Sequence, residues 1–310
     1  MKKHNIILDC DPGHDDAVAL MLAGNHETIN LLGVTVESGN QTLEKTAFNT
    51  LNLVQYLNLD VPVCLGVDSP LIRHVEVAEK IHGESGLDGY TFPPLKKQAD
   101  KRHAVDFIIE TLENAKEPIT LLTTGPLTNI ALVYKLRPDL ITKIAQHVLM
   151  GGSVGSGNVS AAAEFNILCD PEAAHIVFNA DVKRVMVGLD VTRQVKVLPE
   201  IVDRMETINN HVSDLFVKLM RVYNENQLKV FGLPGGPLHD PVTVAYLIDP
   251  SILTLTHASC TIDTSKGPSY GRTNCDLFDY LGEKKNTYVA TDIDGTKFWN
   301  IIETTLKRYD

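Results

Sequence analysis

Short apolar segments alternate with amphipathic segments along most of the chain. The run Ile6-Ile7-Leu8 is typical of a strand buried on both faces, whereas 104–113 has the length and periodicity of a helix. The segments with strand character are 6–8, 29–36, 61–65, 119–123, 146–150 and 185–189. Those with helix character are 17–23, 42–57, 104–113, 127–136 and 171–179. This alternation predicts crossover connections and a parallel sheet.

Two parts of the chain interrupt the alternation. Residues 66–102 carry several Gly and Pro residues without periodicity, so we expect a long loop that is functional or mobile. Beyond Pro199 the pattern is helical to about residue 231, and a further helix, an extended segment at 251–263 and a last helix at 295–307 follow. The predicted fold class is α/β: a doubly wound, mostly parallel sheet with helices on both faces, in a single domain of residues 1–310.

Composition limits the partners of the protein. The 310-residue chain has a formal net charge of −11, so it would repel nucleic acid and anionic membranes, and neither is an expected partner. Its five widely spaced cysteines, without Cys-x-x-Cys, favour reduced and mostly buried thiols. The apolar run near the N-terminus ends at Asp9, too early for a signal peptide. We therefore expect a soluble cytoplasmic protein.

The densest group of candidate functional residues follows the first expected strand, where open α/β sheets bind their ligands. The chain reads Asp9-Cys10-Asp11-Pro12-Gly13-His14-Asp15-Asp16, with four carboxylates in eight residues. These charges repel one another unless a cation lies among them, and Ca²⁺ binds carboxylate and carbonyl oxygens. Because Asp11 and Asp15 or Asp16 lie on either side of one tight turn, we expect a metal site here.

Other interpretations of this cluster have less support. A single Asp in this context is most simply a helix cap or a solvated turn residue. An EF-hand is excluded because its twelve-residue loop with a bidentate Glu is not in the sequence, and no paired Cys or His spacing suits zinc.

A glycine-rich segment, 151–158, follows the strand expected at 146–150. Asn158 stands where a Walker motif requires Lys-Ser/Thr, and the third glycine of a dinucleotide fingerprint is missing, so phosphate binding is disfavoured. Further on, Glu164 and Asn166 would share one side of an extended segment and could grip a pair of hydroxyls. Taken alone, a polar strand edge is the better interpretation of this pair.

Three histidines accompany these segments. His239 precedes Asp240, and a His beside a metal-binding Asp can donate a proton, although helix starts often have this sequence. His82, in the long loop, could act as an acid or a lid residue, or be a solvated loop histidine. We expect His14 to be a turn residue only.

Together these residues resemble the inosine-uridine type nucleoside hydrolases. The segment 9–16 is similar to the family's Asp-x-Asp-x-x-x-Asp-Asp signature. Further matches, in the family's order, are Gly39-Asn40, Thr124-Gly125-Pro126-Leu127-Thr128-Asn129, Met150-Gly151-Gly152, Gly157-Asn158, Glu164-Phe165-Asn166, Asp170-Pro171-Glu172-Ala173 and His239-Asp240-Pro241. The resemblance spans residues 6–241 and is closest to bacterial members that prefer pyrimidine ribonucleosides. It implies Ca²⁺-dependent hydrolysis of a nucleoside to ribose and free base by a homo-oligomer, a dimer or tetramer.

The resemblance also implies a role for each matching position. The Ca²⁺ ligands would be Asp11, Asp16, Asp240 and the Thr124 backbone carbonyl. The ribose hydroxyls would be bound by Asp15, Asn40, Asn158, Glu164 and Asn166, with Asp15 and Asn166 also near the ion. Asp11 would be the general base for a Ca²⁺-bound water, and either His239 or His82 would help the base to leave. The carboxylates would stabilise an oxocarbenium-like transition state.

The base preference depends on a predicted helix. Tyr223, Gln227 and Phe231 recur every four residues and so lie on one helix face, which by the resemblance lines the base pocket. An amphipathic core stripe is the alternative, but Gln227 does not suit a wholly apolar one. Pyrimidine-preferring relatives tend to carry Tyr where Phe231 stands, so a broader inosine/uridine or purine preference stays open.

Two hypotheses of other classes stay open at this point. A Mg²⁺-dependent phosphatase with an aspartyl nucleophile also has Asp-x-Asp after its first strand, but here the residues that follow differ from its usual pattern. A non-catalytic ribose- or nucleoside-binding protein would suit the fold, but it would give the four aspartates no purpose.

Overall fold

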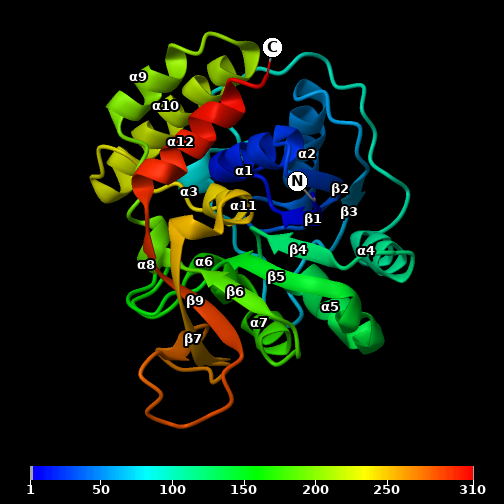
Figure 1. The fold of residues 1–310 in the computed structure, drawn as a ribbon. Helices are drawn as coiled ribbons and strands as arrows, with labels where there is room; N and C mark the ends of the chain where they lie inside the picture. Colours follow the sequence, from blue (N-terminus) through cyan, green and yellow to red (C-terminus); the bar gives the residue numbers. More distant parts are fainter. Residues whose placement is uncertain (1–2, 310) are drawn as a thin grey trace.

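Strand β1 (His4–Cys10) lies inside a nine-stranded sheet because its side chains are apolar on both faces. Ile6 and Leu8 pack into the core on one face, and Ile7 packs into the core on the other. The computed structural model describes residues 3–309, and in it the strand order is β3-β2-β1-β4-β5-β6-β9-β7-β8 (Figure 1).

The sheet is mostly parallel. The other strands are β2 (Ile29–Val36), β3 (Val63–Leu65), β4 (Ile119–Thr123), β5 (Ile144–Met150), β6 (Arg184–Val187), β7 (Leu253–Ile262), β8 (Thr273–Asp276) and β9 (Thr287–Ile293). From β3 to β9 in the sheet order, all neighbours run parallel, whereas β7 pairs antiparallel with both β9 and β8. The predicted fold class is therefore confirmed.

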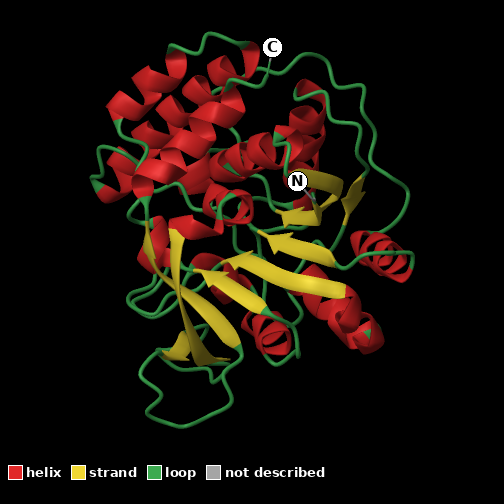
Figure 2. Cartoon of the chain, in the orientation of Figure 1, coloured by secondary structure: helices red, strands yellow, loops and turns green. Residues whose placement is uncertain are grey.

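Helices cover both faces of this sheet (Figure 2). One core contains residues of α1 (His14–Asn25), α2 (Leu43–Tyr56), α9 (Pro199–Glu206), α10 (His211–Phe231), α11 (Pro241–Ile248) and α12 (Gly295–Leu306). The other contains residues of α4 (Ala104–Glu113), α5 (Thr128–Leu136) and α7 (Pro171–Phe178). Within residues 3–309, no helix combines the length and apolar character needed to cross a membrane.

Short helices lie in the connections. They are α3 (Glu79–His82), α6 (Phe165–Cys169), α8 (Leu189–Thr192) and two 3₁₀ helices, Pro138–Lys143 and Pro250–Ile252. The long loop expected at 66–102 is irregular apart from α3. Since α6 and α8 follow the carboxyl ends of β5 and β6, they belong to the edge where ligands are expected.

Several expected boundaries differ from those in the structure. The helical region expected from 199 to 231 is confirmed and consists of two helices, because Asn209 has a positive φ of 57° and Asn210 caps α10 through its side chain. The strand expected at 185–189 ends at Val187, and α8 begins two residues later. Strands β8 and β9 were not predicted, because β8 has the polar sequence Thr-Asn-Cys-Asp and β9 pairs with sequence-distant strands.

The register of the central strands fixes where the candidate residues lie. Asp9, near the end of β1, is level with Thr35 of β2 and with Thr123 of β4. The residues that follow these three positions therefore emerge side by side at one edge of the sheet. That edge receives Asp11 from β1 and Thr124 from β4.

The cysteines are all free thiols. Cys10, Cys64 and Cys260 are buried, and Cys169 and Cys275 are half-buried. This agrees with the expectation of reduced, mostly buried thiols. The Cys260 Sγ donates to the Cys275 Sγ at 2.7 Å, across the directly paired residues of β7 and β8.

A fully buried arginine joins α7 to the end of the sheet. The Arg184 guanidinium donates to the Phe178 and Ala180 carbonyls, at 3.0 and 3.1 Å, and to the Val177 carbonyl. It also donates to the Asn286 carbonyl at 3.1 Å. The cation therefore lies at the negative end of α7 and adds a charged donor to the carbonyls there.

Replacement of Arg184 should strongly destabilise the folded protein. In Arg184→Met, four carbonyls, two of them in buried bonds, lose their charged donor, so we expect the free energy of unfolding to fall by about 3 kcal/mol. Urea unfolding measures this change, with Lys183→Met, at the exposed neighbouring position, as the matched control. A loss in Arg184→Met no larger than in the control would contradict the structural role.

Candidate active site

A cavity of about 540 Å³ lies at the carboxyl edge of the sheet, within the range of small-molecule sites. Most residues singled out in the sequence line it: Asp15, Asn40, His82, Thr124, Asn158, Glu164, Asn166, Tyr223, Gln227, Phe231, His239 and Asp240. The other two, Asp11 and Asp16, are buried next to Asn40 and bond to it. The sequence-predicted residues thus meet in one place.

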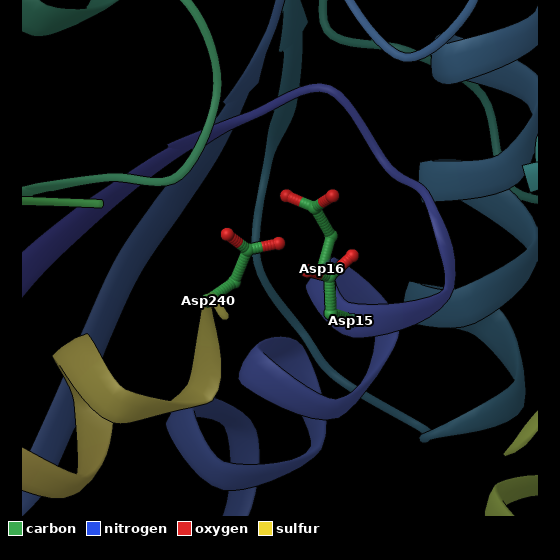
Figure 3. A group of neighbouring side chains, drawn as sticks. All are labelled: Asp15, Asp16 and Asp240. Atoms are coloured by element: carbon green, nitrogen blue, oxygen red, sulfur yellow. The ribbon is translucent and has the colours of Figure 1, made fainter. Parts of the chain in front are cut away.

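Three carboxylates converge at this cavity (Figure 3). Asp15 and Asp16 stand in the first turn of α1, and Asp240 stands at the N-cap of α11. One carboxylate oxygen from each lies within 4.8 Å of the others. The positive ends of the two helix dipoles offset part of the repulsion between these charges.

Asp16 is held in place by three donors. Its Oδ2 accepts the Gly13 backbone N–H at 2.9 Å and the Asn40 side-chain amide at 3.2 Å, and its Oδ1 accepts the Thr124 hydroxyl at 2.7 Å. Asp11 is anchored through Oδ2, which accepts the Asn40 backbone N–H at 2.6 Å. These bonds set the orientation of both carboxylates before any ligand arrives.

Four buried carboxylate oxygens in residues 3–309 have no hydrogen-bond partner, and two of them, Asp11 Oδ1 and Asp15 Oδ1, belong to this cluster. A buried, unpaired carboxylate oxygen is unfavourable and calls for an additional partner. Thr124 adds a backbone carbonyl to the site, which accepts the Asn166 amide at 2.8 Å. Since all of these atoms are hard oxygen donors, the cluster could hold a metal ion of the Ca²⁺ or Mg²⁺ type.

Burial and mutual repulsion change the acidity of the cluster. Burial, with the Asp16 charge second, raises the pKa of Asp15 to about 7. Burial also raises the pKa of Asp11 and of Asp240 well above the ordinary value, and neighbouring aspartates add to both shifts. Without a cation, this group therefore binds protons near neutral pH, and a bound cation would displace them.

Glu164 and Asn166 do not lie in an extended segment, so that expectation was wrong. Glu164 is the N-cap of α6, and its carboxylate accepts the backbone N–H groups of Gly152 and Asn166, both at 2.9 Å. This cap starts a helix directly after residue 164. Asn158 supports the same turn, because its side-chain oxygen accepts the Phe165 N–H at 2.9 Å.

His14 is more than a turn residue. It is fully buried, its Nε2 donates to the Asp88 carbonyl at 2.8 Å, and its backbone N–H donates to the His82 Nδ1 at 3.2 Å. The His14 ring packs against His82 and Tyr223, with centroid distances of 5.5 and 5.6 Å. His14 thus attaches the long loop to α1, and burial lowers its pKa to about 4.

His82 and His239 lie at the same cavity but are held differently. The Nδ1 of His82 is engaged by α1, while its Nε2 has no hydrogen-bond partner among residues 3–309. His239 shares a hydrogen bond of 2.7 Å between its Nδ1 and the Thr192 hydroxyl. Burial, with the Arg193 charge second, lowers the pKa of His239 to about 4, so its resting form near neutral pH is neutral.

All three residues of the expected α10 face line the cavity. Tyr223 and Gln227 are buried, whereas Phe231 is 52% exposed. The Tyr223 hydroxyl donates to the Pro237 carbonyl at 2.8 Å, so that proton is already committed. The apolar exposed ring of Phe231 marks the outer end of this wall.

Sequence reasoning missed the contribution of residues 192–196. Arg193 and Lys196 line the cavity, and Thr192 holds His239. No motif marks these residues. The rule that ligands bind beyond the carboxyl ends of strands would have identified them, had it also been applied to β6.

Comparison with known proteins decides the family. Residues 6–300 match the sequence profile of the inosine-uridine preferring nucleoside hydrolases. The chain belongs to this family. A relative from Escherichia coli, named pyrimidine-specific ribonucleoside hydrolase RihB, is 46% identical over 309 residues, which cover 100% of this chain and 99% of the relative. A protein of the same name from Escherichia fergusonii is equally similar.

Solved structures of nucleoside hydrolases have the same fold. The purine-preferring ribonucleoside hydrolase from Gardnerella vaginalis superposes with a TM-score of 0.91 at 31% identity, over 98% of this chain and 99% of that one. An inosine-guanosine nucleoside hydrolase gives 0.90 at 28% identity, over 99% of each chain. The protein is a ribonucleoside hydrolase, an enzyme that cleaves N-glycosyl bonds with water.

The raised pKa of Asp15 predicts how stability depends on pH in the metal-free enzyme. With an ordinary pKa of 3.8 when unfolded and about 7 when folded, the folded state binds more protons between those values. The Asp15 carboxyl therefore lowers stability progressively as the pH rises from about 4 to about 7. We expect Asp15→Asn to gain stability relative to the wild type across this window and to hold that gain above it.

Urea unfolding in a chelator, at a series of pH values, measures this difference. The buried histidines are common to both proteins, so their opposite pH dependence cancels. Asp68→Asn, at an exposed position, serves as the control. A pH-independent difference for Asp15→Asn would contradict the raised pKa.

Proposed function

We propose that this enzyme hydrolyses pyrimidine ribonucleosides, uridine and cytidine, to ribose and free base. The observation that carries the proposal is the meeting of buried carboxylates with a ring of amide and carboxylate side chains in one cavity. Such a floor suits a reaction in which the ribose becomes positively charged. The identity of 46% with relatives named as pyrimidine-specific supports the choice of base.

The cation that we propose for the cluster is Ca²⁺. Asp11, Asp16, Asp240 and the Thr124 carbonyl would hold it, and the geometry adds Asp15, whose carboxylate is grouped with those of Asp16 and Asp240. When bound, the cation would orient a water molecule and make it easier to deprotonate. The unpartnered oxygens of Asp11 and Asp15 support this assignment.

Asp11 is the residue that we assign as general base. Its Oδ2 is fixed by the Asn40 N–H, so its Oδ1 is left to accept a proton from the attacking water. The water oxygen forms the new bond to the anomeric carbon, and the bond to the base breaks. The negative charges of Asp15 and Asp240, which line the cavity, would stabilise the oxocarbenium character of the ribose.

Ribose would be recognised through its hydroxyls. The proposed partners are Asp15, Asn40, Asn158, Glu164 and Asn166, which all line the cavity. Asn40 and Glu164 are themselves fixed by hydrogen bonds to other parts of the site, so they are oriented in advance. A site built to bond hydroxyls rejects a sugar that lacks one of them.

The base would lie between α3, α10 and the start of α11. His82 offers its free Nε2, and His239 lines the same cavity, so either could assist departure of the base by donating a hydrogen bond or a proton. Purine nucleosides are the second candidate, because Phe231 offers no hydroxyl and the Gardnerella enzyme of the same fold is named as purine-preferring. Gln227 supplies the polar edge in either case.

We propose further that the enzyme is a cytoplasmic homo-oligomer, a tetramer or dimer. Its free cysteines suit a reducing compartment. The connection between β8 and β9 exposes Phe278, Tyr280 and Leu281, each more than 70% accessible, which suits a subunit contact.

A substrate panel tests the reaction and the base preference together. Uridine, cytidine, inosine and adenosine are incubated with the enzyme in Ca²⁺ and in a chelator, and ribose release is measured. We expect release from uridine and cytidine first, loss of release in the chelator, and at least about a hundredfold lower release from 2′-deoxyuridine. Faster release from inosine than from uridine would overturn the pyrimidine preference and leave the hydrolase assignment intact.

Removal of the general base tests the mechanism. Asp11→Asn retains the size of the side chain but cannot accept the proton, so kcat should fall at least about a hundredfold. Steady-state kinetics on uridine measures this, with Asp68→Asn as the exposed control. Near-normal turnover by Asp11→Asn would exclude Asp11 as the base.

A further inference from the structure

One short turn of the chain contacts two separate parts of the active site. We call residues 188–193, which comprise Gly188, helix α8 and Arg193, the α8 turn. It lies beside the glycine-rich segment 151–158, here called the glycine loop, which ends at Asn158. Neither the signature residues nor the proposed mechanism uses the α8 turn.

The first half of the α8 turn binds the start of the glycine loop. The Leu189 N–H donates to the Gly152 carbonyl at 2.9 Å. The Asp190 carboxylate then accepts the Val154 N–H at 2.7 Å and the Gly155 N–H at 3.0 Å. A charged acceptor thus fixes two successive peptide groups, and such charge-assisted bonds are the stronger kind.

Arg193 binds the second half of the same loop. Its Nη1 donates to the Ser156 carbonyl and to the Ser156 hydroxyl, both at 3.0 Å, and its Nη2 donates to the Gly157 carbonyl at 2.7 Å. No carboxylate within residues 3–309 lies at salt-bridge distance from this guanidinium. The planar fork therefore bonds loop oxygens alone, next to Asn158.

The opposite side of the turn bonds to the base end of the cavity. Thr192, fully buried, shares the 2.7 Å hydrogen bond with the His239 ring. Arg193 itself lines the cavity. The α8 turn thus connects the glycine loop, which carries Asn158, with His239, at the end of the cavity where the base would bind.

The glycine loop needs these contacts because its own sequence does little to restrict its conformation. Four of its eight residues are glycine, and residues 155–160 are mostly exposed. Glycine has the largest conformational freedom to lose, so an unsupported segment of this kind samples many conformations. Only a held loop can present Asn158 in one position to a sugar.

We propose that Arg193 and Asp190 are positioning residues for ribose recognition, which clamp the glycine loop so that Asn158 faces the sugar. This inference rests on the ribose-binding role proposed above for Asn158. Neither residue needs to touch the substrate, because each acts through the loop backbone. Loss of the clamp should therefore weaken ribose binding and leave binding of the free base unchanged.

Product inhibition of ribonucleoside hydrolysis separates the two halves of the substrate. D-ribose and uracil are used as inhibitors of the wild type, Arg193→Gln, Arg193→Lys, Asp190→Asn and Asn158→Ala. We expect Arg193→Gln and Asp190→Asn to raise the inhibition constant of ribose about tenfold, with that of uracil unchanged. The inhibition constant of ribose for Arg193→Lys should lie between those for the wild type and Arg193→Gln, because an ammonium group cannot span both carbonyls.

A double variant and a control exclude a general structural effect. If Arg193 acts through Asn158, Arg193→Gln combined with Asn158→Ala should bind ribose no more weakly than Asn158→Ala alone. Arg204→Gln removes an arginine of similar exposure on α9, outside the site, and should change neither inhibition constant. Melting temperatures of all variants show whether the fold is retained.

Three results would overturn the clamp. A raised inhibition constant for uracil with that of ribose unchanged would place Arg193 on the base instead. An unchanged constant for ribose in Arg193→Gln, beside a raised one in Asn158→Ala, would overturn the clamp alone. Unchanged constants in both would overturn the ribose role of Asn158 as well, while ribose release by the wild type would still establish hydrolysis.

Discussion

The structure depends on the burial of several like charges at one edge of the sheet. Asp11, Asp15, Asp16 and Asp240 are all less than 5% exposed, and burial raises the pKa of each. Such a group is unfavourable in a folded protein unless protons or a cation compensate it. A fold that nonetheless buries these carboxylates is less stable in itself, and a bound ligand would restore that stability, as is common at functional sites.

The surrounding elements make this burial tolerable. Parallel neighbours of β1 bring donors level with the carboxylates, and two helix N-termini face them. Close backbone approach is essential at Gly39, where an added Cβ would lie 2.0 Å from the Asp11 Oδ2. The residue that follows Gly39 supplies the N–H that orients Asp11. Local sequence, sheet register and site geometry are thus parts of one arrangement.

Sequence alone predicted the features that depend on local pattern. Apolar runs identified strands β1 to β6, and four aspartates around Pro12-Gly13 identified the carboxylate-rich part of the site. Contacts between distant segments could not be predicted in this way. The burial of His14 depends on the long loop and on α10, and the clamp at Arg193 depends on a loop some 36 residues away. The break between α9 and α10 at Asn209 could have been predicted from the sequence, because asparagine favours both a left-handed turn and an N-cap.

The site combines the earliest and some of the latest parts of the chain to be synthesised. Asp240 is added more than two hundred residues after Asp16, which corresponds to roughly 10–45 s of translation. During that interval the nascent chain carries its first aspartates without the third member of their cluster. A cation held by the complete cluster, as proposed above, would therefore not be an early template for folding. Its capture would be a late step, open only to chains that have been elongated past α11.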